Sequence, residues 1–423
     1  MQYKIHTLKN GLRVIFAPMK DTQTATVLIL VGTGSRYETK KTNGLAHFLE
    51  HMFFKGTQKR PTTLAIAEEL DAVGGEYNAY TSKDHTGYWA KVDSKHVGVA
   101  LDVVSDIFLN AKIEQKEINR ERGPILQELN MYEDMPIRHI GDLFELLLFG
   151  DHPLGREILG TRENINGVMR KDFIDYLDQY YVASNTVVAV SGNFSQKDVL
   201  KKITQDFVDM RVGEKPSFVS YDSDYVPSSP VYVQDKKTDQ TQLMVGVGAY
   251  GFRSKNRYAL AVLSAILGGG MSSRLFIAVR ERRGLAYNVR TMTEAYADAG
   301  CLVTQAGVEH DNVEEALKII LREYRRTRRE KVLRKELSKA KDFLKGRLVL
   351  GLESSDEVAT FFAEQEVVKG KITPLSEHLE NIDKVRAADV HRVANEIFQT
   401  DRLRLAIIGP HGDGQQLRGL LKV

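Results

Sequence analysis

The sequence predicts an α+β protein of two homologous halves, each a mainly antiparallel sheet layered with helices. The segment 27–38 resembles 241–252, and 185–194 resembles 402–411; each contains an apolar strand that runs into glycine. Counted between matching glycines, the two offsets are 216 and 217 residues. Two independent landmarks that agree to within one residue indicate an internal duplication.

The stretch 213–230 separates the two halves. It is rich in Pro, Ser and Asp and has no sustained hydrophobic period, which is typical of a linker. We therefore expect a first half at 1–212 and a second half at 231–423. Each half mixes alternating strands with amphipathic helices, and this pattern predicts helices packed on one face of each sheet.

The first predicted element is a strand–turn–strand unit over 1–18, with Asn10 and Gly11 as the turn. No charged-then-apolar leader or Arg/Ser-rich segment precedes it, and no apolar run approaches the ~20 residues that span a bilayer. A single cysteine, Cys301, allows no internal disulfide and fits a reducing compartment. The expectation is a cytoplasmic protein that does not contact a membrane.

The composition limits the possible partners. Hydrophobic residues make up 42% of the 423 residues, which is enough for proper cores. The net charge of +3 is small for a chain of this size. It therefore indicates no obligate nucleic-acid partner.

The segment 44–56 is predicted to be a helix with an apolar stripe. Its hydrophobic residues recur at three- and four-residue spacing. Thr42 or Asn43 can cap its start, and Gly56 can end it.

Three titratable side chains interrupt that stripe. His47 and His51 are four residues apart and Glu50 is three from His47, so all three lie on one face of the helix. Two imidazoles at this spacing can bind one zinc ion while the carboxylate stays free to hold water. The order His-x-x-Glu-His is the inverted form of the common zinc-protease motif. A core helix whose histidines have ordinary hydrogen-bond partners is the alternative, so a zinc site needs a third ligand.

A third ligand is expected from the helix predicted at 117–134. Glu121 and Glu128 are seven residues apart and so share a face of that helix. Pro124 lies between them, where it removes a helix hydrogen bond and should kink the helix. The direction in which the side chain of Glu128 points is therefore less closely defined than the directions of the two histidines.

Two further segments have recognisable local patterns. The segment 73–92 reads as strand, short turn and strand, and 272–289 reads as a helix ended by Gly284 and followed by a strand. From the patterns alone, the first is an ordinary hairpin with a polar edge. Arg280 and Tyr287 in the second segment are, on the same basis, unremarkable surface residues.

Together, these motifs resemble the pitrilysin/insulinase family of zinc metallopeptidases, which includes the mitochondrial processing peptidases. The resemblance rests on the inverted motif, followed after 76 residues by Glu128, with Glu121 seven positions before it. It implies that His47, His51 and Glu128 bind one zinc ion per protomer and that Glu50 is the general base. Glu121 would be a second carboxylate that orients a ligand histidine.

The resemblance also implies roles for the two other segments. The hairpin at 73–92 is similar to the family's edge strand, where Asn78 and Ala79 would meet the backbone of a peptide that adds as a further strand. An arginine and a tyrosine seven residues apart contact the substrate carbonyl beside the zinc in this family, and Arg280 and Tyr287 match that spacing. A guanidinium and a phenol can both donate to a developing oxyanion.

The expected function is a zinc endopeptidase that cleaves unfolded peptides or small polypeptides inside a dimeric chamber. Large family members hold two segments, each about as long as this chain, with the zinc motif in the first and the arginine–tyrosine pair in the second. One chain with both predicts a homodimer with shared active sites. A non-catalytic scaffold subunit and a catalytic subunit with a different partner chain are the alternatives; the intact motif residues weigh against both.

Overall fold

The computed structural model describes residues 1–221, 225 and 227–423. The chain forms two compact units, each built from several stretches of sequence. Unit 1 comprises Met1–Leu129, Glu157–Val219 and Val349–Pro374. Unit 2 comprises Asn130–Arg156, Ser220–Leu348 and Leu375–Val423.

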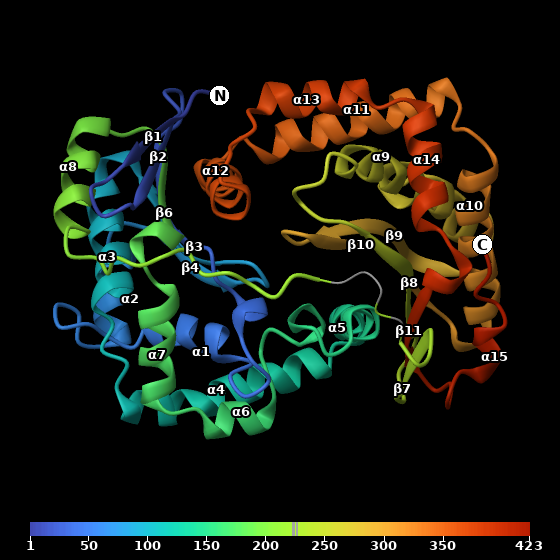
Figure 1. Ribbon diagram of the computed structural model, residues 1–423, viewed down its shortest axis with the longest axis horizontal. Coiled ribbons are helices and arrows are strands. Elements are labelled where there is room, and N and C mark those ends of the chain that lie inside the picture. The colour runs from blue at the N-terminus through green and yellow to red at the C-terminus, as the bar shows by residue number, and fades with distance from the viewer. Residues whose placement is uncertain (222–224, 226) are drawn as a thin grey trace. The chain divides into compact units, whose positions relative to one another are not determined.

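Unit 1 is built on a six-stranded sheet (Figure 1). Its strands follow the order β1-β2-β6-β3-β5-β4, in which β2 and β6 are parallel and all other neighbours are antiparallel. The predicted N-terminal hairpin is present as β1 and β2, and Gly11 takes a positive φ of 92° in its turn. The strands are β1 (Lys4–Thr7), β2 (Arg13–Pro18), β3 (Thr24–Val31), β4 (Glu76–Thr81), β5 (Thr86–Asp93) and β6 (Thr186–Gly192).

Helices cover both faces of this sheet. Val27, Ile29 and Val31 of β3 belong to the main core with residues of α1 and α3. The hydroxyls of Thr24 and Thr26, on the opposite face of β3, hydrogen-bond to Ser355 at the start of α12. The helices are α1 (Leu45–Phe53), α2 (Thr63–Asp71), α3 (Val97–Asn110), α4 (Gln115–Glu133, which ends in unit 2), α6 (Arg162–Gly167), α7 (Arg170–Tyr180), α8 (Gln196–Asp206) and α12 (Ser355–Lys369).

Unit 2 repeats this design with a five-stranded sheet. Its order, β7-β11-β8-β10-β9, matches β2-β6-β3-β5-β4 of unit 1 and again has one parallel pair, β7 with β11. The segments that resemble each other in sequence form β3 and β8, and β6 and β11. The prediction of two homologous halves with mainly antiparallel sheets is therefore confirmed. The strands are β7 (Val231–Asp235), β8 (Thr241–Tyr250), β9 (Ala286–Ala295), β10 (Ala299–Val308) and β11 (Arg404–Gly409).

The sheet of unit 2 also has helices on both faces. Leu302 of β10 packs in the core formed with α9, α10 and α14. Its neighbours Cys301 and Val303 pack on the other face, against Leu143 and Phe144 of α5. The remaining helices are α5 (Pro136–Phe149), α9 (Arg257–Gly268), α10 (Val313–Arg329), α11 (Arg334–Gly351), α13 (Leu375–Lys384), α14 (Ala387–Ile397) and α15 (Gln415–Arg418).

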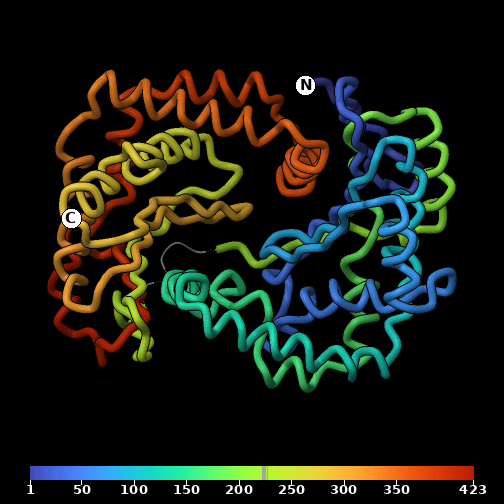
Figure 2. Tube along the Cα trace, turned by 180° about the vertical axis from the view of Figure 1, so that it is seen from behind, coloured from blue at the N-terminus to red at the C-terminus, as the bar shows by residue number. Residues whose placement is uncertain are grey.

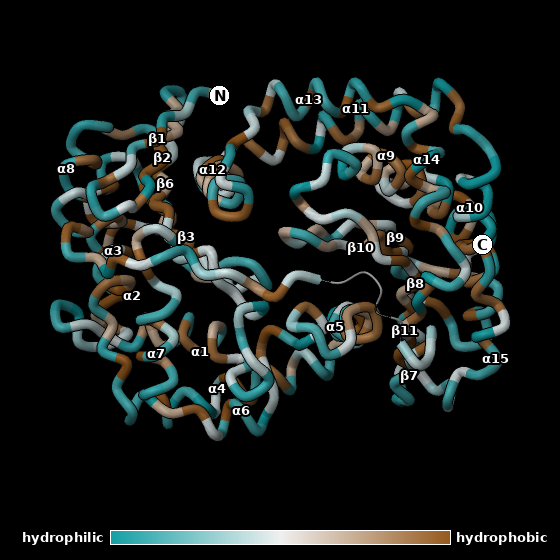
Figure 3. The backbone as a smooth tube through the Cα atoms, in the orientation of Figure 1, coloured by the Kyte–Doolittle hydropathy of each residue, from teal (hydrophilic) through white to brown (hydrophobic). Residues whose placement is uncertain are grey.

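The second helical face of each sheet comes from a distant part of the sequence. Helix α12, which follows most of unit 2 in sequence, packs on the sheet of unit 1, and α5 packs on the sheet of unit 2 (Figure 2). Figure 3 shows α5 as a largely hydrophobic helix, as a helix buried on a sheet must be. The prediction of helices on only one face is therefore wrong, because each half donates one helix to the other half's sheet.

The structure describes only part of the predicted linker 213–230. Residues 222–224 and 226 lie outside the described residues, and the described remainder of this stretch contains no helix or strand. The expected boundaries at 212 and 231 stay a prediction, because the compact units reflect packing and not the sequence repeat. Among the described helices, none has the length and apolarity required to cross a bilayer.

Candidate metal centre

Helix α1 forms as expected and places its two histidines side by side. Its apolar stripe is buried in the core of unit 1, where Leu49 and Met52 are fully enclosed. This packing fixes the rotation of the helix about its axis. The rings of His47 and His51 then lie with their centroids 4.7 Å apart.

Glu128 reaches the same point from α4. Its Oε2 lies 3.5 Å from Nε2 of His47 and 3.4 Å from Nε2 of His51. Helix α4 runs from Gln115 to Glu133 with Pro124 inside it, so the proline does not end the helix. The structure thus brings together the three side chains that the sequence placed on two separate helices.

The three donor atoms suit a zinc ion. They all lie within 4.8 Å of one another, two on imidazoles and one on a carboxylate. Ligand atoms that each lie ~2.0–2.1 Å from a tetrahedral zinc ion are about 3.4 Å apart, close to the distances from Glu128 to both histidines. His47, His51 and Glu128 could therefore hold zinc and leave a fourth position open.

Glu121 lies behind this group, on the side of His51 away from Glu128. Its Oε1 is 3.0 Å from Nδ1 of His51 and its Oε2 is 2.5 Å from Nζ of Lys55. Burial acts to raise the pKa of Glu121, but the hydrogen bonds from His51 and Lys55 outweigh it and lower the pKa below its usual value. An ionised Glu121 at Nδ1 leaves Nε2 of His51 free to bind a metal.

Glu50 does not belong to the three-residue group and has its own partner. The hydroxyl of Thr81, at the end of strand β4, donates to Oε2 of Glu50 at 2.6 Å. Burial raises the pKa of the Glu50 carboxyl, although His47 and His51 act in the opposite direction. A carboxylate with a raised pKa beside a metal centre is suited to accept a proton.

Strand β4 is the edge of its sheet, as expected. It pairs with β5 on one side only, and helix α1 packs against it. Asn78 is exposed on this strand, whereas the side chain of Ala79 is buried. Only backbone groups of Ala79 could meet a ligand, as strand addition would require.

A buried carboxylate caps α1, contrary to the expected caps Thr42 and Asn43. The residue before the helix is Gly44, with a φ of 97°, and a glycine has no side chain with which to cap the helix. Glu38 accepts hydrogen bonds from the backbone N–H of Gly44 at 2.9 Å and of Ala46 at 2.6 Å. Burial raises the pKa of Glu38 to about 7 in spite of these donors. A cap from outside the helix fixes the N-terminal end of the histidine-bearing segment.

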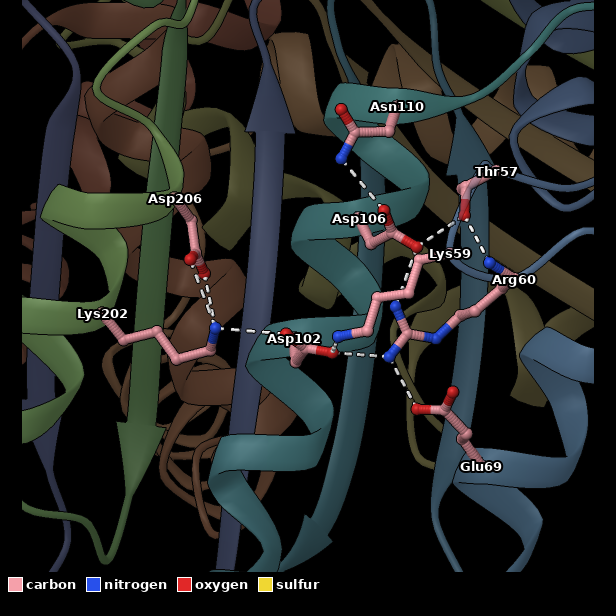
Figure 4. Close-up of polar contacts among 9 residues, drawn as sticks. All are labelled: Thr57, Lys59, Arg60, Glu69, Asp102, Asp106, Asn110, Lys202 and Asp206. Carbon is pink, nitrogen blue, oxygen red and sulfur yellow. Dashed lines mark hydrogen bonds and ion pairs between the residues drawn. The ribbon is translucent and has the colours of Figure 1, made fainter.

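The loop after α1 is fixed by an ionic network around Arg60 (Figure 4). The guanidinium is 1% exposed and binds Asp106 at 2.8 Å, Asp102 at 2.5 Å and Glu69 at 2.6 Å. These carboxylates lie on α3 and α2, so one side chain ties the loop to two helices. The opposite end of α1 is therefore also immobilised.

Arg280 and Tyr287 lie together in unit 2. The guanidinium carbon of Arg280 is 4.8 Å from the centre of the Tyr287 ring and 4.9 Å from that of Phe276, which are cation–π contacts. Tyr287 is 78% exposed at the start of β9, the edge strand of its sheet. The structure thus places these two residues in contact with each other, while their role toward a substrate stays a prediction.

The helix that carries Arg280 differs from the expected one. Residues Phe276–Glu281 form a π-helical turn, in which the N–H of Arg282 bonds to the carbonyl of Ile277 five residues earlier. Gly284 ends this turn with a positive φ, as predicted. π-helical turns are rare and occur frequently at functional sites.

Both halves of the chain match models of known protein families. Residues 13–162 match the model of insulinase, peptidase family M16, and residues 167–344 match the model of the peptidase M16 inactive domain. The chain belongs to peptidase family M16. The predicted family and its enzyme class, a metallopeptidase, are thereby confirmed.

Several M16 proteins are similar to this chain along its whole length. The zinc protease YmxG of Bacillus subtilis is 34% identical over 97% of this chain and 99% of its own, and a zinc protease of Mycobacterium leprae is 33% identical over 99% and 94%. A protease from Helicobacter pylori shares the fold, with a TM-score of 0.88, 24% identity and coverage of 97% and 99% of the two chains.

The same fold occurs in a multi-chain complex. A chain of Complex III2 from Candida albicans also shares it, with a TM-score of 0.86, 21% identity and coverage of 99% of this chain and 100% of its own. In this chain, the residues that could hold a metal lie on α1 and α4.

Sequence reasoning missed three residues that hold this site together: Lys55, Thr81 and Glu38. Lys55 follows His51 by four residues, so helical spacing could have placed it on the histidine face. Thr81 and Glu38 offered no comparable signal, because their contacts with Glu50 and with the start of α1 join separate segments.

Proposed function

We propose that this protein is a zinc endopeptidase that cleaves unfolded peptides or small polypeptides. This proposal rests on one observation. The donor atoms of His47, His51 and Glu128 lie at the distances expected between zinc ligands, and Glu50 lies beside them. Zinc held by these three residues would polarise the scissile carbonyl and acidify a water molecule.

In this proposal, proton transfer belongs to Glu50. Its carboxylate takes a proton from the attacking water and passes it to the leaving amine. The hydroxyl of Thr81 holds this carboxylate by donating to its Oε2. Because Thr81 ends strand β4, the same contact sets the base beside the strand on which the substrate would lie.

Substrate binding is proposed to occur by strand addition to β4 at Asn78 and Ala79. Among the described residues no further strand pairs with β4, so its outer edge can offer backbone groups to an extended peptide. Recognition through main-chain groups accepts many sequences, whereas a folded protein has no free strand to offer. The expected substrates are therefore unfolded segments.

We further propose a homodimer with shared active sites in the cytoplasm. Arg280 and Tyr287 of one protomer would donate to the oxyanion formed at the zinc site of its partner. The exposure of Tyr287 and its contact with Arg280 in unit 2 support a role at a surface that meets another molecule.

Metal removal tests the proposed activity. The purified protein should bind one zinc per protomer, and chelation should abolish cleavage of a mixed peptide library read out by mass spectrometry. Returning zinc should restore the same products. Full activity after chelation, or the absence of stoichiometric zinc in the untreated protein, would show that this is not a zinc peptidase and would favour a scaffold role.

Glu121→Gln should weaken zinc affinity or activity by ~10–100-fold, the usual effect of altering a residue that orients a metal ligand. The amide still reaches Nδ1 of His51 but carries no charge. Competition with a chelating dye gives the affinity. Glu117→Gln, one turn earlier on α4, is the control and should behave as wild type. An unchanged Glu121 variant would show that this carboxylate does not support the metal.

A further inference from the structure

A lysine extends the line of polar contacts behind the metal centre. Lys55 lies two residues beyond the end of α1 and four after His51. Its Nζ is 2.5 Å from Oε2 of Glu121, whose Oε1 is 3.0 Å from Nδ1 of His51. The ammonium of Lys55, the carboxylate of Glu121 and the imidazole of His51 thus form a continuous chain of contacts.

Both oxygens of Glu121 are occupied by groups from a single segment. The side chain of Glu121 is only 7% exposed and that of Lys55 is 21% exposed. Removal of Lys55 would take an ionic partner from Oε2 of Glu121, a buried, charged oxygen. An unpaired buried charge is costly to keep. The carboxylate would then turn toward solvent, which weakens its hold on His51.

We propose that Lys55 is a positioning residue of the metal centre: it holds the carboxylate of Glu121 in place against Nδ1 of His51, so that His51 presents Nε2 to the metal. This inference rests on the proposed zinc site. Lys55 contacts Oε2 of Glu121 while His51 contacts Oε1, so Lys55 acts through that carboxylate and not on the substrate.

Lys55→Met tests the inference through metal affinity, measured by dye competition on the full-length protein. We expect zinc to bind about tenfold more weakly, since removing a group that supports a ligand costs ~10–100-fold. Lys55→Arg, which keeps the charge, should stay within about threefold of wild type by the same scale. Cobalt in place of zinc should give an altered visible spectrum in the Met variant and a normal one in the Arg variant.

A double variant separates action through Glu121 from a general effect of charge. If Lys55 acts through Glu121, adding Lys55→Met to Glu121→Gln should weaken zinc binding no further than Glu121→Gln alone. The matched control is Lys116→Met, which breaks a surface pair with Glu114 at 2.8 Å and should leave affinity unchanged. Lys55→Gln is a second neutral variant in case Lys55→Met does not fold, as judged by circular dichroism.

Each outcome decides between the proposals. Wild-type affinity in a folded neutral variant, with zinc bound stoichiometrically by the wild type, would overturn the role of Lys55 and leave the peptidase intact. Fully additive losses in the double variant would also overturn it, because Lys55 would then act independently of Glu121. A wild type that binds no zinc would remove the proposed function and this inference together.

Discussion

Replacing Glu50 by Gln should lower the rate of peptide cleavage by several orders of magnitude while the protein keeps its zinc and its fold. The amide can still accept the hydrogen bond from Thr81 at 2.6 Å, so the local packing is preserved. It cannot take a proton from water. General acid–base help is worth ~10²–10⁴-fold, and activation of the water is impaired as well.

The measurement pairs kcat with zinc content and a thermal melt. Glu68→Gln, on the exposed side of α2, is the matched control and should retain full activity. If Glu50→Gln loses its zinc instead, Glu50 is a zinc ligand and not the general base. If it keeps both zinc and activity, another group is the base.

Tyr287→Phe should lower kcat by about 10²–10³-fold, as loss of one oxyanion donor does. The ring and its contact with Arg280 remain, so only the hydroxyl is removed. Tyr232→Phe removes a hydroxyl from another partly exposed tyrosine of unit 2 and should have no effect.

Mixing the two inactive variants tests whether the sites are shared. Random exchange makes about half of the dimers mixed, and each mixed dimer has one site with an intact Glu50 from one chain and an intact Tyr287 from the other. Activity should therefore recover to roughly a quarter of wild type. If the subunits demonstrably exchange and activity stays at the level of the separate variants, each site lies within one chain.

Local patterns in the sequence were enough to find much of the fold and of the candidate site. The helix at α1, the hairpin of β4 and β5 and the strand pairs of the internal repeat all appear in the structure. Spacing along one helix placed His47, Glu50 and His51 on a single face. These features depend on helical or strand periodicity, which can be recognised from residues that are close together in the sequence.

Contacts between distant segments could not be read in this way. Pro124 left the aim of Glu128 open, and only packing of α4 shows that its carboxylate reaches both histidines. The cap from Glu38 replaced the nearby caps that the sequence offered, because a buried carboxylate reaches the N–H groups of Gly44 and Ala46.

The exchange of helices between the two sheets is the largest feature that the sequence did not reveal. Backbone hydrogen bonds and side-chain periodicity are local, so contiguous residues determine that α5 and α12 are helical and which of their residues are apolar. They do not show which sheet receives each apolar face. Burial favours any complementary apolar surface without regard to sequence distance, so only the packed molecule decides that α12 covers β3 and α5 covers β10.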